Sequence, residues 1–162
     1  MIVVADASPL RYLILIEHTH VLPLLYGHVH VPSVVVTELT RQQSPAVVQE
    51  WIGHRPDWVR VLDPTRAIVP VEGLHRGELA AIALAEELAA DVLLIDDRDG
   101  RRVAERRGVA VLGTLRVLAD AAEHGFADLQ TALGGLRQTN FRASEQLFRA
   151  LLDRDLAQKR GL

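Results

Sequence analysis

The stretch Val92–Gly100, with the sequence VLLIDDRDG, decides how the rest of the chain is interpreted. Four apolar residues without polar alternation are typical of a strand buried on both faces, as in a parallel sheet covered by helices. Three acids follow within four residues: Asp96, Asp97 and Asp99. In open α/β sheets, ligands bind in the crevice beyond the carboxyl ends of the strands. Carboxylates gathered there repel one another unless a cation joins them.

Other apolar runs predict further strands of the same sheet. Residues 2–5 form a second run of the buried type, which also stops at an acid, Asp6. Shorter runs at residues 29–31, 58–62 and 109–112 predict three more strands. Ser8 before Pro9 predicts a helix N-cap, with the helix over residues 10–17, and Asp99 predicts the cap of a helix that ends near Arg107. Strands that alternate with helices predict an α/β fold.

Residues 33–41 are ambiguous between two kinds of secondary structure. The run from Val34 to Thr37 has the β-branched composition of a strand. Ser33 after Pro32 is a good N-cap, and the following Glu38 suits a helix. We favour a helix that carries Glu38 just beyond a strand end.

Composition narrows the class of protein. With 162 residues, 49% of them hydrophobic and 24% charged, the chain is predicted to form one domain with a substantial core. The absence of cysteine excludes a disulfide framework and a thiolate nucleophile. The beginning of the chain lacks the basic segment of a signal peptide, and no apolar run reaches membrane-spanning length. We therefore expect a cytoplasmic protein without a membrane partner.

Four acids fall at the ends of predicted elements: Asp6, Glu38, Glu78 and Asp96. Their separations of 32, 40 and 18 residues allow each to come from a different βα unit. Mg²⁺ and Mn²⁺ take carboxylate and water oxygens in sites of this kind. Such sites suit phosphodiester hydrolysis, because the ion binds a phosphate oxygen, lowers the pKa of water and stabilises the leaving oxygen.

At this point the sequence resembles a known family. The motifs are IVVADASPL at residues 2–10, VPSVVVTEL at 31–39, LHRGELAAIALA at 74–85, LLIDDRDGRR at 93–102 and GTL at 113–115. In this order they look like PIN domains, and more narrowly the prokaryotic toxin-type PIN nucleases, the VapC-like proteins. The resemblance covers residues 1–125. It implies a PIN-like three-layer α/β fold with a parallel five-stranded sheet in the order 3-2-1-4-5 and helices on both faces. It also implies Mg²⁺- or Mn²⁺-dependent cleavage of single-stranded RNA, and the match at Glu38 favours a helix there.

The resemblance assigns roles to individual residues. Asp6, Glu38, Glu78 and Asp96 match the acidic catalytic quartet of the family. Metal ligation is expected from Asp6, Glu78 and Asp96, with Asp97 as a further ligand or a support, and whether Asp96 or Asp97 is the main ligand stays open. Ser8 and Thr114 are expected to support the acids. The arginines after the second acidic strand, Arg98, Arg101 and Arg102, are candidates for RNA phosphate contacts, although such a run is often a solvated helix face.

Two other functions remain open. A signalling receiver domain also gathers acids at strand ends around Mg²⁺, but it needs a lysine at the end of its last strand. The single lysine of this chain, Lys159, lies in its last few residues. A PIN-like module that binds RNA or a protein partner without cleaving it is the main alternative to a toxin nuclease.

The segment from about residue 126 onwards is predicted to be a helical extension of the domain. A last amphipathic helix is expected within residues 140–160, with Phe141, Phe148 and three leucines (147, 151, 152) on its apolar side. Such a stripe must be buried on its own domain, on a second copy or on a partner. The family resemblance favours a homodimer, and it implies an antitoxin that reaches into the acidic cleft with a basic side chain.

Overall fold

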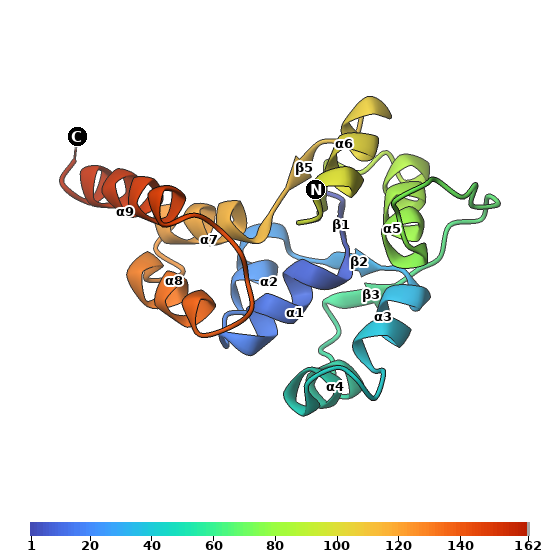
Figure 1. Cartoon of the computed structure of the whole chain (residues 1–162), viewed down its shortest axis with the longest axis horizontal. Coiled ribbons are helices and arrows are strands. Elements are labelled where there is room, and N and C mark those ends of the chain that lie inside the picture. The colour runs from blue at the N-terminus through green and yellow to red at the C-terminus, as the bar shows by residue number, and fades with distance from the viewer. Residues whose placement is uncertain (162) are drawn as a thin grey trace.

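The computed structural model describes residues 1–161 and shows a parallel sheet with helices on both faces (Figure 1). The two central strands are apolar and buried throughout, as expected for strands covered on both sides, whereas the strands at 29–31 and 59–61 carry His30 and Arg60 at their centres. They follow the order β3-β2-β1-β4-β5, and every pairing is parallel, which confirms the predicted topology. The strands are β1 (Val3–Ala5), β2 (Val29–Val31), β3 (Val59–Val61), β4 (Val92–Leu94) and β5 (Val111–Leu112).

Helices connect the strands and form the two outer layers. Parallel strands need such crossovers, because a chain that leaves the end of one strand must return to the start of the next. The helices are α1 (Ala7–Leu15), α2 (Val21–Tyr26), α3 (Ser33–Leu39), α4 (Ala46–Gly53), α5 (Arg76–Glu87), α6 (Arg98–Arg106), α7 (Thr114–Glu123), α8 (Leu129–Arg137) and α9 (Glu145–Lys159). The ambiguous segment after β2 is therefore the helix α3, as favoured from the sequence.

The two faces of the sheet bury different sets of side chains. Val3 and Ala5 of β1 join the larger cluster, which includes apolar residues of α1, α2, α3, α4, α7 and α8. Val4, which points the other way, joins a smaller cluster with α5 and α6. The many alanines of α5 let this helix lie close to the sheet, where Ala81 and Ala85 are fully buried. No helix among residues 1–161 is long and apolar enough to cross a membrane.

Two helices and one strand begin at residues other than those predicted. Helix α1 starts at Ala7, with Asp6 as its N-cap. Pro9 is tolerated in the first turn, because the N–H groups of that turn have no partner within the helix and the N–H that proline lacks is not needed there. Helix α6 starts at Arg98, and its cap is Asp97 rather than Asp99: the Asp97 carboxylate accepts a hydrogen bond of 2.8 Å from the Gly100 N–H. The strand expected over residues 109–112 is reduced to the two residues of β5.

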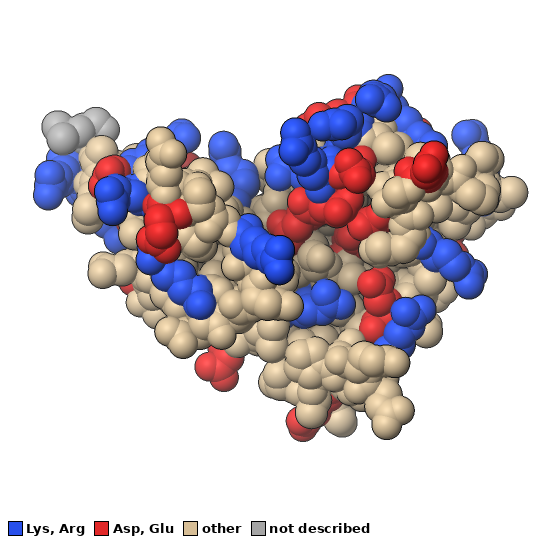
Figure 2. Space-filling view, viewed as in Figure 1, with Lys and Arg blue, Asp and Glu red and all other residues tan. Residues whose placement is uncertain are grey.

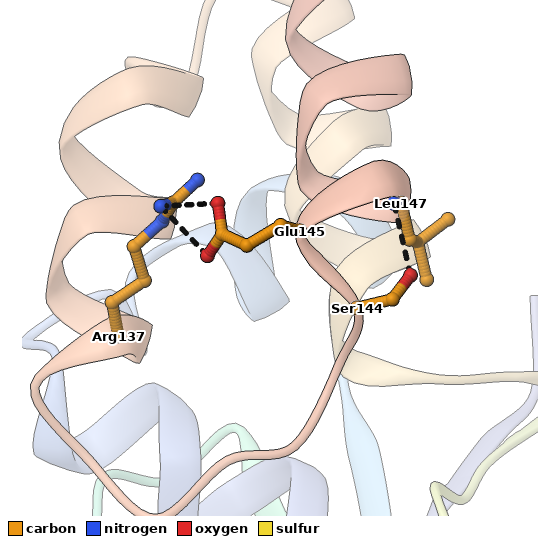
Figure 3. A network of polar contacts seen from close by, with 4 residues as sticks. All are labelled: Arg137, Ser144, Glu145 and Leu147. Carbon is orange, nitrogen blue, oxygen red and sulfur yellow. Dashed lines mark hydrogen bonds and ion pairs between the residues drawn. The ribbon is translucent and has the colours of Figure 1, made fainter.

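The last helix lies within the expected range, but it does not include Phe141. Ser144 caps α9 by accepting a hydrogen bond from the Leu147 N–H, and Arg137 at the end of α8 pairs with Glu145 at 2.8 Å (Figure 3). Phe141 is therefore outside the helix, where it packs edge-on against Tyr12 with ring centroids 4.9 Å apart. Phe148 is buried under the Arg137 guanidinium. Part of the apolar stripe thus packs within its own chain.

Candidate active site

Asp6 lies at the carboxyl end of the central strand, in the middle of the sheet. Its N–H donates to the Leu94 carbonyl of β4 at 2.9 Å, which ties it to the neighbouring strand end. The side chain is only 2% exposed, and its Oδ1 has no hydrogen-bond partner within residues 1–161. Burial, aided by the charges of Glu78 and Glu38, raises the pKa of Asp6 from 3.8 to about 7, although the Ala7 N–H and His75 act in the opposite direction. An orphaned buried carboxylate oxygen is a free donor for a cation.

Glu78 reaches the same place from the first turn of α5. It is 5% exposed, and its carboxylate accepts a hydrogen bond from the backbone N–H of His75 at 3.3 Å. The imidazole Nε2 of His75 lies 3.0 Å from the other carboxylate oxygen. Burial raises the pKa of Glu78, and so do the charges of Asp97 and Glu38, while His75 lowers it. Helix α5 therefore holds this acid between a histidine and two other acids.

Glu38 joins these acids from the end of α3, which packs against α5. The side chain is half-buried, and a Cβ atom placed on Gly77 would lie 2.7 Å from its Oε2. The Glu38 carboxylate thus occupies the space that a larger residue at position 77 would need. Its charge raises the pKa of both Asp6 and Glu78. The contact between α3 and α5 brings Glu38 to the same carboxyl edge of the sheet as these two residues.

Asp96 occupies the next position along the same sheet edge but has other partners. One carboxylate oxygen accepts from the Thr114 N–H and the other from the Thr114 hydroxyl, both at 2.7 Å. Burial raises the pKa of Asp96, and these two hydrogen bonds and the charge of Arg101 oppose the rise. Thr114 is fully buried at the start of α7. Its expected supporting role therefore has a defined geometry, in which Thr114 orients Asp96.

Asp97 is exposed and serves as the cap of α6, but its charge also reaches the site. One of its carboxylate oxygens is engaged by the Gly100 N–H. The same carboxylate contributes to the raised pKa of Glu78. The two acids therefore have different partners: Asp96 is held by Thr114, whereas Asp97 is held by the start of α6 and acts on Glu78 through its charge.

The remaining predicted residues differ in their relation to the acids. Ser8 is half-buried in the first turn of α1 and forms no side-chain hydrogen bond within the described chain. Arg101 faces Asp96, and its guanidinium lies 3.3 Å from where a Cβ of Gly113 would stand. Arg98 and Arg102 are exposed on the same helix.

Two glycines of the site were not singled out from the sequence. Gly77 makes room for the Glu38 carboxylate, and Gly113 lets the chain pass close to Asp96, since a Cβ there would stand 3.0 Å from an Asp96 oxygen. Each glycine directly precedes a residue that was singled out, Glu78 or Thr114. A glycine next to a candidate site residue is a signal of close approach that the sequence could have supplied.

The acids gather in a hollow of the molecular surface. Figure 2 shows acidic side chains together near the centre of one face, with basic side chains on both sides of them. As the side chains stand, no three acids or histidines within residues 1–161 are arranged to hold a metal ion. Mg²⁺ keeps several waters and needs only one or two protein carboxylates, so a complete protein cage is not required. The hard oxygen donors and the orphaned Asp6 oxygen fit Mg²⁺ or Mn²⁺.

The fold and the site together define a class: an α/β domain of PIN type, whose sheet edge carries acids from several βα units. The sequence matches the DUF3368 family, described as a PIN domain, over residues 2–156, and the chain belongs to this family. Its fold is similar to that of a PilT N-terminus domain protein from the hyperthermophilic archaeon Sulfolobus solfataricus P2. That pair shares 20% sequence identity with a TM-score of 0.55, over 75% of this chain and 93% of the other. No curated protein matches the sequence. PIN domains are generally nucleases, so the protein is a nuclease-type module.

Proposed function

We propose that this protein is a Mg²⁺- or Mn²⁺-dependent endoribonuclease that cleaves single-stranded RNA. The observation that carries the proposal is Asp6: a buried carboxylate with an orphaned oxygen and a pKa raised to about 7, facing the charges of Glu78 and Glu38. Maintaining such a group is unfavourable for the fold, because a buried like-charged cluster is costly. A bound divalent cation would offset the repulsion between the carboxylates, which explains why the fold keeps them together.

The proposal gives each residue of the acidic cluster its own role in phosphodiester hydrolysis. In the proposal, Asp6, Glu78 and Asp96 would hold the ion. Asp97 would be a further ligand or a support for Glu78, and Glu38 would add a fourth negative charge that attracts the ion. A divalent ion in this position supplies charge for the phosphate and lowers the pKa of a water molecule. Thr114 keeps Asp96 in one orientation through two hydrogen bonds. The reaction joins a water oxygen to phosphorus and breaks the bond to O3′, leaving a 5′-phosphate and a 3′-hydroxyl.

The main test is metal-dependent cleavage by the purified protein. A labelled single-stranded RNA should be cut with Mn²⁺ and remain intact with EDTA. The Asp6→Asn variant should lose the activity, whereas Asp153→Asn, which changes an exposed acid of α9, should retain it. RNA that is bound but never cut under any metal condition would favour the non-catalytic module instead.

A receiver-type signalling function gains no support from the geometry. Lys159 lies on α9 and pairs with Asp155 at 3.0 Å and with Asp128 at 3.6 Å. It is therefore engaged by acids of the C-terminal helices rather than by the acidic cluster at the sheet edge.

The resemblance to toxin-type nucleases supports a proposal for the biological setting. We propose that the protein is the toxin of a toxin–antitoxin pair, acts on cytoplasmic RNA and is silenced by a protein that places a basic side chain among the acids. Expression of the wild type, but not of Asp6→Asn, should then arrest growth.

We also propose a homodimer in the absence of the antitoxin. The support is Leu156 of α9, a large apolar side chain that is 48% exposed and lies outside the grooves described below. Light scattering at tens of micromolar tests it, and a monomer there would contradict it.

A further inference from the structure

Two grooves meet the acidic cluster from different sides. The first, here called the α9 groove, runs between the start of α7 and the α8–α9 connector and includes Asp96, Arg101, Phe141, Arg142 and Leu147. The second, here called the α4 groove, runs between α1, the α3–α4 loop and the same connector and includes Arg11, Glu38, Arg41, Gln138 and Asn140. Their volumes of about 540 and about 850 Å³ leave room in each for at least one nucleotide.

Each groove ends at one member of the acidic set. Asp96 lies in the α9 groove and Glu38 in the α4 groove. These acids belong to the segments that follow β4 and β2, the strands on the two sides of β1 and Asp6, so the two grooves lie on different sides of Asp6. The α8–α9 connector is their common wall: residues 138–140 line one groove, and residues 141–143 line the other. A ligand that followed both grooves would therefore cross the acids.

The connector is held firmly enough to act as a wall. At its two ends, Arg137 pairs with Glu145 between α8 and α9 (Figure 3). In its middle, the Tyr12 hydroxyl donates to Asn140 at 2.9 Å, and the Tyr12 ring packs on Phe141. Tyr12 of α1 thus anchors the connector at the point where its contacts change from one groove to the other.

The charged lining of both grooves suits phosphate. Four groove arginines, Arg11, Arg41, Arg101 and Arg142, have no ion-pair partner within residues 1–161. Arg116, which also lines the α9 groove, is by contrast paired with Asp120 at 2.9 Å. Unpaired guanidinium groups attract phosphate along a strand, while the acids between them repel it unless a cation is bound.

The α9 groove also offers apolar surface beside its arginines. Phe141 is half-buried, and Leu147 is 44% exposed. Unpaired bases bind well to such surfaces, whereas the bases of a duplex are stacked inside it and cannot reach them. The combination of free arginines and apolar contacts therefore favours a single strand over a duplex or a lone phosphate.

We propose that the two grooves bind one single-stranded RNA, which passes over the acidic cluster between them. This inference rests on the proposed ribonuclease function and names the residues that hold its substrate. Arg142 and Phe141 hold the strand on the α9 side, and Arg41 and Arg11 hold it on the α4 side. Of the arginines of α6, only Arg101 lines these grooves, so Arg98 and Arg102 are outside the path.

Binding of a fluorescent single-stranded RNA of about 12 nucleotides tests the path in the presence of Ca²⁺, which takes carboxylate oxygens and so offsets the repulsion of the acids, with the RNA checked on a gel to be intact. Arg142→Gln and Arg41→Gln should each weaken binding roughly fivefold at 0.1 M salt, because each lost phosphate contact lowers the salt slope by about 0.7. The double variant should lose roughly 25-fold, since the sites are separate. Arg149→Gln is the matched control: it removes the same charge from an exposed site on α9 outside both grooves and should change neither affinity nor slope.

The outcomes separate this inference from the proposed function. If the wild type cleaves RNA with Mn²⁺ but both groove variants bind like Arg149→Gln, the path is wrong and the nuclease stands. If the groove variants weaken binding as expected but no metal supports cleavage, the path stands and the nuclease is wrong. A wild type with no affinity for single strands, or with equal affinity for the duplex, also overturns the path and leaves the grooves to another occupant, such as a protein segment.

Discussion

Replacing Asp6 by asparagine should stabilise the metal-free protein at neutral pH. The pKa of Asp6 rises from 3.8 to about 7 on folding, chiefly because the side chain is buried. This rise of about 3 pH units corresponds to about 4 kcal/mol at about 1.36 kcal/mol per unit. Asparagine keeps buried polar atoms of its own, so we expect a gain of about 2–4 kcal/mol in the free energy of unfolding. The same substitution should abolish cleavage.

The pH dependence identifies the cause of the gain. Between pH 4 and pH 7 the folded wild type holds a proton on Asp6 that the unfolded chain has released. Folding is therefore favoured at low pH by this group, and its contribution to stability is lost as the pH rises towards about 7. The difference between Asp6→Asn and the wild type should grow over this interval and level off above it.

Urea denaturation in EDTA at several pH values measures the effect. The exposed Asp153→Asn serves as the control and should stay within about 0.5 kcal/mol of the wild type. Added Mg²⁺ should stabilise the wild type but not Asp6→Asn, because a ligand that binds only the folded state shifts unfolding by mass action. An Asp6→Asn variant no more stable than the wild type at pH 8, or a difference that does not vary with pH, would refute the reasoning.

Three further predictions concern neighbouring groups. Thr114→Val should destabilise the fold by about 1–3 kcal/mol in urea denaturation, because Asp96 loses a buried hydrogen bond, whereas Thr114→Ser should not. Gly77→Ala should reduce Mn²⁺-dependent cleavage with little change in melting temperature, because its Cβ would displace the Glu38 carboxylate. The control is Gly134→Ala, where an added Cβ meets no neighbouring atom, and it should leave cleavage unchanged. Mn²⁺ affinity measured by calorimetry should fall at least tenfold from pH 8 to pH 6, because the ion competes with the proton on Asp6, and an affinity independent of pH would contradict this.

Local patterns determined much of the architecture. The apolar runs that stop at Asp6 and Asp96 predicted the central strands, because a strand covered on both faces cannot tolerate polar alternation. The strand order 3-2-1-4-5 came from the family resemblance, and the structure has this order. The ends of the predicted elements named the candidate acids, Asp6, Glu38, Glu78 and Asp96. The start of α1 was predicted wrongly, since Ser8-Pro9 is as compatible with the first turn as with a cap.

Only the tertiary structure decided which group binds each of the acids. Thr114, 18 residues further along the chain, binds both oxygens of Asp96, and Asp97 caps its own helix while its charge acts on Glu78. The burial that raises the pKa of Asp6, and the place of Gly77 beside Glu38, depend on how α3 and α5 pack against each other and β1. Distances between segments far apart in sequence set these properties, and no pattern within a single segment contains them.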